Sequence, residues 1–218
     1  MSRSERADRV VGELVHEHGR TYAEEAGIPL KDAPQPLYRL LLMALLLSAR
    51  IRTSIALETV RALQEAGLRD PRRMAGADWQ ERVDALGRGG YRRYDERTAT
   101  QLGDGAELLM ERWGGDLRRL RKEAHGDVPT LRGLLQEIPG IGPAGADIFL
   151  REVQRVWPEV APYLDAKALS GAERLGLPKD PGKLVRLAGD SEPAVLSAAL
   201  VRAALDKKVA QGVLEHAA

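Results

Sequence analysis

Apolar residues recur every three or four positions along most of this chain, which is the spacing of one face of an α-helix. Val10, Val11, Leu14 and Val15 form such a stripe and predict a first helix over residues 4–18. No stretch sustains the alternation of β-branched residues that is typical of strands. An all-α protein is therefore predicted, with further helices over residues 37–48, 54–66, 78–87, 94–113, 116–123, 131–137, 143–156, 166–175, 181–187 and 193–215.

The segment 37–48 is apolar on every side, so it is predicted to be a buried central helix. The longest strongly apolar run, residues 40–49, is too short to cross a membrane. The N-terminal segment is charged and lacks the apolar core of a signal peptide. We therefore expect a soluble cytoplasmic protein that has no membrane partner.

Composition excludes several kinds of site. The chain has 218 residues, enough for one large domain or two modest ones, and no cysteine, which rules out disulfides, thiolate zinc sites and Cys-ligated iron–sulfur clusters. Its four histidines are too scattered along the sequence to suggest a metal site. With 33 Lys and Arg against 32 acidic residues, the net charge of +1 neither demands nor excludes a nucleic-acid partner. No metal or cofactor is predicted.

A tight hairpin interrupts the helical pattern at Pro139, Gly140, Gly142 and Pro143. The two glycines allow backbone angles and close approaches that a Cβ would block. Proline suits the first turn of the next helix, where a missing N–H costs nothing. Bare amides at a helix start, together with the helix dipole, can bind a phosphate. The alternative is a plain helix–helix turn, which is the commoner use of such residues when they occur alone.

The wider context of the hairpin resembles one protein family. Residues 125–147 read HGDVPTLRGLLQEIPGIGPAGAD, and residues 156–165 read VWPEVAPYLD. This order resembles the helix-hairpin-helix superfamily of DNA glycosylases that carries a Gly/Pro-rich loop and an Asp (HhH-GPD), and within it the endonuclease III branch. Upstream, LLLSAR at 45–50 is similar to that family's L-L-S-A-Q, and residues 90–97 to its G-x-Y-x-x-K helix start. The resemblance runs from about residue 40 to 175.

The resemblance implies an architecture and a DNA-binding surface. It implies two helical subdomains with a DNA-binding cleft between them, one over residues 37–158 and the other from residues 1–36 plus 159–218. It also implies that the hairpin binds the DNA backbone through Gly140, Gly142, Ala144 and Gly145. A monovalent cation held by the hairpin carbonyls is compatible with the family pattern.

Three departures from the family pattern bear on activity. The bifunctional members carry a catalytic lysine two residues after the second hairpin glycine, and Ala144 stands there in this chain. The loop that holds an iron–sulfur cluster is absent, because there is no cysteine. The segment between hairpin and Asp165 is also about one helical turn longer, which preserves the helix phase.

Asp165 is the candidate catalytic residue by this resemblance. Cleavage of the bond between a base and deoxyribose develops oxocarbenium-like charge, which an adjacent anion stabilises. The carboxylate could also activate or orient the attacking water. The simpler alternative is an N-cap for the helix over residues 166–175, and both roles are compatible. Lys167 could supply an amine only if burial or a cationic neighbour removed its proton, so a phosphate contact or plain exposure to solvent is the favoured role.

Other residues are candidates for DNA contact. A target base in a duplex has to be flipped out of the stack and the gap filled. Arg50 stands where the family inserts a Gln into the duplex. Arg92 and Arg93, between Tyr91 and Tyr94, combine phosphate partners with aromatic faces, although an ordinary amphipathic helix start would look similar.

The sequence therefore predicts a monofunctional DNA glycosylase of base excision repair, without AP-lyase activity, that acts as a monomer in the nucleoid. Its partner would be double-stranded DNA that contains a lesion or a mismatch. Two alternatives stay open: a non-catalytic DNA-binding or damage-sensing protein on the same scaffold, and a helical interaction module that uses the hairpin only as a turn. The sequence does not identify the base.

Overall fold

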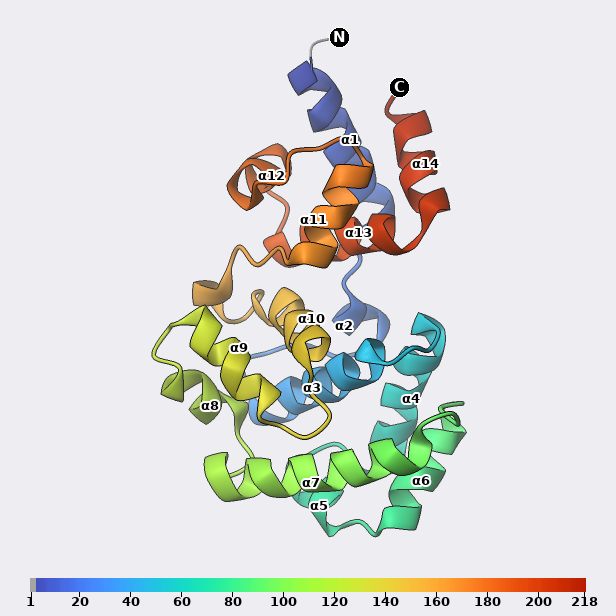
Figure 1. Cartoon of the computed structure of the whole chain (residues 1–218), viewed down its shortest axis with the longest axis vertical. Helices are drawn as coiled ribbons and strands as arrows, with labels where there is room; N and C mark the ends of the chain where they lie inside the picture. Colours follow the sequence, from blue (N-terminus) through green and yellow to red (C-terminus); the bar gives the residue numbers. More distant parts are fainter. Residues whose placement is uncertain (1–2) are drawn as a thin grey trace. The chain divides into compact units, whose positions relative to one another are not determined.

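The computed structural model describes residues 3–218 and builds them from helices, without a strand among them (Figure 1). This confirms the predicted all-α class. The elements are α1 (Arg3–His18), α2 (Tyr22–Glu25), α3 (Pro34–Ser48), α4 (Thr53–Glu65), α5 (Pro71–Gly76), α6 (Trp79–Arg88), α7 (Asp95–Trp113), α8 (Leu117–Glu123), α9 (Val128–Gln136), α10 (Pro143–Val153), the 3₁₀ helix η1 (Pro158–Val160), α11 (Ala166–Arg174), α12 (Pro181–Leu187), α13 (Pro193–Leu205) and α14 (Lys207–His216).

Aspartate is the usual residue at the start of these helices. Its short side chain accepts a hydrogen bond from an otherwise unpaired amide of the first turn. Seven described helices begin with such an N-cap, namely Asp70, Asp78, Asp116, Asp127, Asp165, Asp180 and Asp206.

Two of these caps correct the predicted helix bounds. The helix predicted over residues 193–215 is divided into α13 and α14, because Asp206 is extended and its side chain accepts from the Lys208 amide. The helix predicted over residues 131–137 begins earlier, at Val128, because Asp127 is the N-cap of α9 and accepts from the Thr130 amide at 2.9 Å.

The chain divides into two compact units. Residues 23–150 form the contiguous unit, and residues up to 22 together with 151–218 form the discontinuous unit. Both boundaries lie earlier than the predicted ones at 37 and 158. Two hydrogen bonds explain the N-terminal boundary. Arg39 Nη2 donates to the Gly27 carbonyl at 3.0 Å, and Arg61 Nη2 donates to the Glu25 carbonyl at 2.5 Å. They hold the segment after Tyr22 against α3 and α4.

In the contiguous unit, α3 is the central helix that its all-apolar sequence predicts. Every residue from Leu37 to Leu46 is buried, Arg39 included. Helices α4 and α8 pack against α3, and α7 packs along α5 and α6 (Figure 1). The turn after α6 presses on α4, since a Cβ on Gly89 would lie 2.3 Å from the Thr59 Cα. This contact fixes the segment that carries Arg92 and Arg93.

In the discontinuous unit, α13 is the core helix and α11 crosses it closely. Most of α13 is buried, and Ala, Leu and Val make up most of its sequence. A Cβ on Gly171 of α11 would lie 1.9 Å from the Leu200 carbonyl oxygen, so only glycine permits this crossing. Helices α1 and α14 lie side by side and also pack on α13 (Figure 1). Backbone contact with α13 therefore sets the position of α11, whose N-cap is Asp165.

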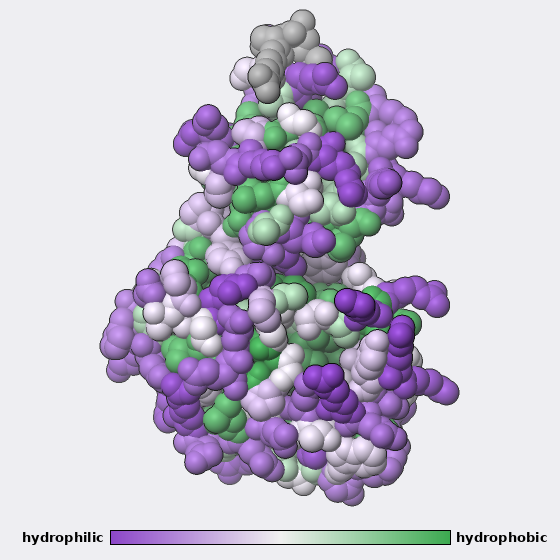
Figure 2. Space-filling model, viewed as in Figure 1, coloured by the Kyte–Doolittle hydropathy of each residue, from purple (hydrophilic) through white to green (hydrophobic). Residues whose placement is uncertain are grey.

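The surface is largely hydrophilic on the face that Figure 2 shows, and hydrophobic residues appear there in separate small areas. Trp79 and Leu205 are the large hydrophobic side chains that are most exposed among the described residues. Within residues 3–218, the helices are all too short or too polar to cross a membrane.

Candidate functional site

The hairpin between α9 and α10 is built on two buried isoleucines and one obligatory glycine. Ile138 and Ile141 are each 3% exposed, and the Ile141 amide donates to the Ile138 carbonyl at 3.0 Å. Gly140 has a φ of +88°, a conformation that residues with a Cβ rarely adopt. A Cβ there would also lie 2.7 Å from Leu45 Cδ1 and 3.2 Å from Gln101 Cβ. The hairpin is therefore seated against α3 and α7.

The tip of the hairpin is exposed and bare. Gly142, Pro143 and Ala144 are exposed, whereas Gly145 is buried, and a Cβ on Gly142 would meet no atom within 4 Å. The Ala146 amide is the first in α10 to find a helical partner, the Gly142 carbonyl at 3.0 Å. The amides of Ala144 and Gly145 precede it and have no intrahelical acceptor. Together with the helix dipole, they form a place where an anion can bind.

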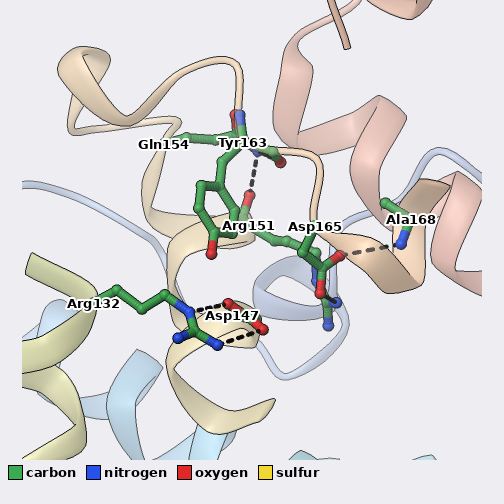
Figure 3. Close-up of polar contacts among 7 residues, drawn as sticks. All are labelled: Arg132, Asp147, Arg151, Gln154, Tyr163, Asp165 and Ala168. Carbon is green, nitrogen blue, oxygen red and sulfur yellow. Dashed lines mark hydrogen bonds and ion pairs between the residues drawn. The ribbon is translucent and has the colours of Figure 1, made fainter. Parts of the chain in front are cut away.

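An ion pair that the sequence reading missed joins the two helices of the motif. Arg132 of α9 donates from Nε to Asp147 Oδ1 at 2.7 Å and from Nη2 to Oδ2 at 3.2 Å (Figure 3). Both side chains are partly buried, at 35% and 21% exposure. Such a two-point contact fixes orientation as well as distance. It holds α9 and α10 at the angle that presents the hairpin.

Asp165 lies in the extended backbone just before α11, and its carboxylate has a donor on each oxygen. Oδ1 accepts from the Ala168 amide at 3.1 Å, which makes Asp165 the N-cap of α11 (Figure 3). Oδ2 accepts from Arg151 Nη1 at 2.8 Å. Both side chains are only 9% exposed. The expected N-cap is confirmed, and the catalytic role of Asp165 stays a prediction.

The loop that leads to Asp165 is anchored by a glutamine. Gln154 Nε2 donates to the carbonyls of Arg151, at 2.8 Å, and Tyr163, at 3.1 Å, while its Oε1 accepts from the Tyr163 amide at 2.7 Å (Figure 3). Trp157 is fully buried and holds the middle of the loop. These contacts leave Asp165 little freedom, since the residues on both sides of it are fixed.

The predicted basic contacts are all exposed. Arg50 follows α3, and Arg92 and Arg93 precede α7, the two helices that contact Gly140. The structure thus groups these arginines with the hairpin in the contiguous unit, while Asp165 and Lys167 belong to the discontinuous one. Lys167 is exposed on the first turn of α11, without the burial that would favour an amine nucleophile.

The two tyrosines that flank Arg92 and Arg93 differ. Tyr91 is 3% exposed and its hydroxyl lies 3.0 Å from Thr98 Oγ1, so its ring offers no aromatic face to DNA. Burial raises the pKa of the Tyr91 phenol, and the hydrogen bond with Thr98 opposes this. Tyr94 is only partly buried, and the Arg93 guanidinium lies 5.2 Å from the centre of its ring. Tyr94 and Arg93 are thus the pair that can take part in stacking.

No cluster of three or more His, Asp or Glu side chains that could hold a metal ion occurs among residues 3–218.

No known protein family and no curated protein sequence matches the chain. Among solved structures, it is similar to a protein captured in a trapped endonuclease III–DNA covalent intermediate, an estranged-adenine complex. The TM-score is 0.49 at 17% sequence identity, over 89% of this chain and 84% of that one.

Proposed function

We propose that this chain is a monofunctional DNA N-glycosylase, a hydrolase that removes a damaged or mismatched base from double-stranded DNA. The observation that carries the proposal is the Asp165 carboxylate, buried at the start of α11 and held there by Arg151 and the Ala168 amide. The ordered motifs around the hairpin support it, and so does the exposed helix start at Ala144. We place the protein, as a monomer, with the nucleoid.

DNA binding is assigned to the hairpin and the arginines grouped with it. The amides of Ala144 and Gly145 hold a backbone phosphate, which positions the duplex without reading its sequence. Arg92 and Arg93 add phosphate contacts. Arg50 enters the duplex and occupies the space of the flipped nucleotide, where its planar guanidinium can stack on the base left behind.

The chemical step needs an anion and water, but no amine. As the bond from C1′ to the base breaks, its electron pair leaves with the base and positive charge develops on the sugar. Asp165 stabilises that charge, and removing such a stabiliser typically costs about 10²- to 10³-fold in rate. Water then adds to C1′ and gives up a proton to the solvent, and the departing base takes up one proton, so the products are the C1′ hydroxyl and the neutral base. Since Ala144 cannot form a Schiff base, the product is an abasic site in an intact strand.

A second candidate is a non-catalytic DNA-binding or damage-sensing protein. The observation that favours it is that both oxygens of Asp165 already accept hydrogen bonds within the protein. A purely structural helix cap looks the same. Only activity separates the two candidates.

The decisive experiment incubates wild type and Asp165→Asn with a panel of duplexes, each carrying one lesion or mismatch, followed by alkali. We expect cleavage at one class of base after alkali and none before it, no covalent complex after borohydride, and a loss of at least about 10²-fold in Asp165→Asn. The matched control is Asp180→Asn, which changes the exposed N-cap of α12 and should leave the rate unchanged. Wild type that binds every duplex and excises nothing would establish the non-catalytic candidate instead.

A further inference from the structure

Arg151 stands out among the arginines that pair with helix caps. Among the residues that the structure describes, three N-cap aspartates have an arginine partner: Asp70 with Arg73, Asp116 with Arg118, and Asp165 with Arg151. The first two arginine side chains are 55% and 44% exposed, and that of Arg151 is 9% exposed. The two exposed arginines belong to the same helix start that their aspartate caps. Arg151 reaches Asp165 from the last turn of a different helix, α10.

Stability alone does not explain such a pair. Two charges lose their hydration when they are buried, and apolar residues of similar size are often as stable or more stable in the same place. Capping α11 also needs no arginine, because the cap bond uses Oδ1 and Arg151 binds Oδ2. We therefore explain the buried Arg151 by its effect on the Asp165 carboxylate.

Arg151 and Gln154 together set the position of that carboxylate. Gln154 binds the Arg151 carbonyl and both backbone groups of Tyr163, two residues before Asp165. Arg151 binds Asp165 itself. The last turn of α10 therefore holds the loop at Tyr163 and the side chain at Asp165. These two contacts fix the direction of the Asp165 carboxylate as well as its position.

Building on the proposed glycosylase activity, we infer that Arg151 is a positioning residue that aims Asp165 at the sugar and commits it to an electrostatic role. A donor on each oxygen suits a fixed negative charge better than a base that must accept a proton from water. Arg151 touches neither DNA nor the reacting atoms in this scheme. It acts on the chemical step through Asp165 and has no part in binding the duplex.

The test measures single-turnover excision at saturating protein, together with duplex affinity, for wild type, Arg151→Met and Arg151→Lys, each also combined with Asp165→Asn. We expect Arg151→Met to lower the rate constant by about 10²-fold, the scale of a misplaced catalytic group, and to leave the Kd unchanged. Arg151→Lys keeps a cation that can donate to Asp165, so it should recover part of the loss, and it also serves if Arg151→Met does not fold. In the Asp165→Asn background, neither change should lower the rate further.

The outcomes separate this inference from the function on which it rests. Wild type that excises no base overturns the proposed function, and this inference with it. Wild type that excises, with variants that melt at lower temperature but excise at the wild-type rate when folded, overturns the inference alone by showing a structural pair. An equal loss in both backgrounds overturns it too, because Arg151 would then act without Asp165.

Discussion

Gly171 should be the least replaceable glycine in the discontinuous unit. We predict that Gly171→Ala destabilises the protein although alanine is the better helix former. The added Cβ would lie 1.9 Å from the Leu200 carbonyl oxygen, 2.8 Å from its carbonyl carbon and 3.2 Å from the Ala204 amide nitrogen. All three obstacles are backbone atoms, so no side chain can rotate away and α11 must move off α13.

The magnitude follows from two opposing terms. A carbon normally approaches a carbonyl oxygen no closer than about 3.3 Å, so the helices must separate by roughly 1.4 Å at this point. Overpacking of this kind costs about 1–3 kcal/mol, and we take the upper end because the backbone is rigid. Replacing glycine by alanine in a helix returns about 1 kcal/mol. The net loss is about 2 kcal/mol, which lowers the Tm by roughly 4–8 °C in a chain of this length.

The assay is thermal unfolding followed by far-ultraviolet circular dichroism, with Gly12→Ala as the matched control. Gly12 lies in α1 of the same unit, is exposed, and has no atom within 4 Å of an added Cβ. The same substitution there should raise the Tm by about 2–4 °C, since only the helix term remains. If both variants raise the Tm alike, α11 and α13 do not cross in backbone contact and the reasoning is refuted.

Two further predictions concern the hairpin and acid stability. Gly142→Arg should leave the Tm unchanged, because position 142 is open, and should weaken binding to all duplexes alike, because it adjoins the amides of Ala144 and Gly145. Gly140→Arg should weaken binding and also lower the Tm, because φ at Gly140 is +88° and Leu45 fills the space that the side chain would need. Equal duplex affinity in wild type and Gly142→Arg would count against a hairpin contact with DNA. The Trp113 indole N–H and then Arg112 hold the pKa of Glu123 below its ordinary value. This group therefore adds stability at pH values above its unfolded pKa, and the contribution disappears as the pH falls through the lower folded pKa. The free energy of unfolding of Glu123→Gln should therefore change less than that of wild type over this acidic range, and identical pH profiles would contradict the assignment.

Periodicity and turn residues were enough to predict most of the helices. Apolar spacing located α1, α3, α4 and α7 to within a few residues, and the Pro and Gly cluster located the hairpin. The sequence did not predict the short helices α2 and α5, because four and six residues are too few to show a helical period. The sequence also did not predict the break between α13 and α14 at Asp206, because an aspartate between two apolar segments is compatible with one continuous helix as well as with a helix cap.

The surroundings of the candidate site were less accessible to sequence. Asp165 could be predicted as a helix start because the signal is local. Its partner Arg151 and the pair of Arg132 with Asp147 are joined across 14 and 15 residues, and only the packing of separate elements brings them together. The chain has 33 Lys and Arg and 32 acidic residues, so nothing local distinguishes these pairs from the many other combinations.

The repeated use of aspartate as a helix cap has an evolutionary consequence. Asp165 is the N-cap of α11, as Asp180 is of α12, so selection for folding alone would preserve a residue that can cap a helix at position 165. Asn, Ser and Thr can cap almost as well, but they carry no charge. A descendant that no longer needed catalysis could therefore exchange Asp165 for one of them and still cap α11. Arg151 would then be buried without its partner, and we expect it to be replaced soon afterwards in the same lineage.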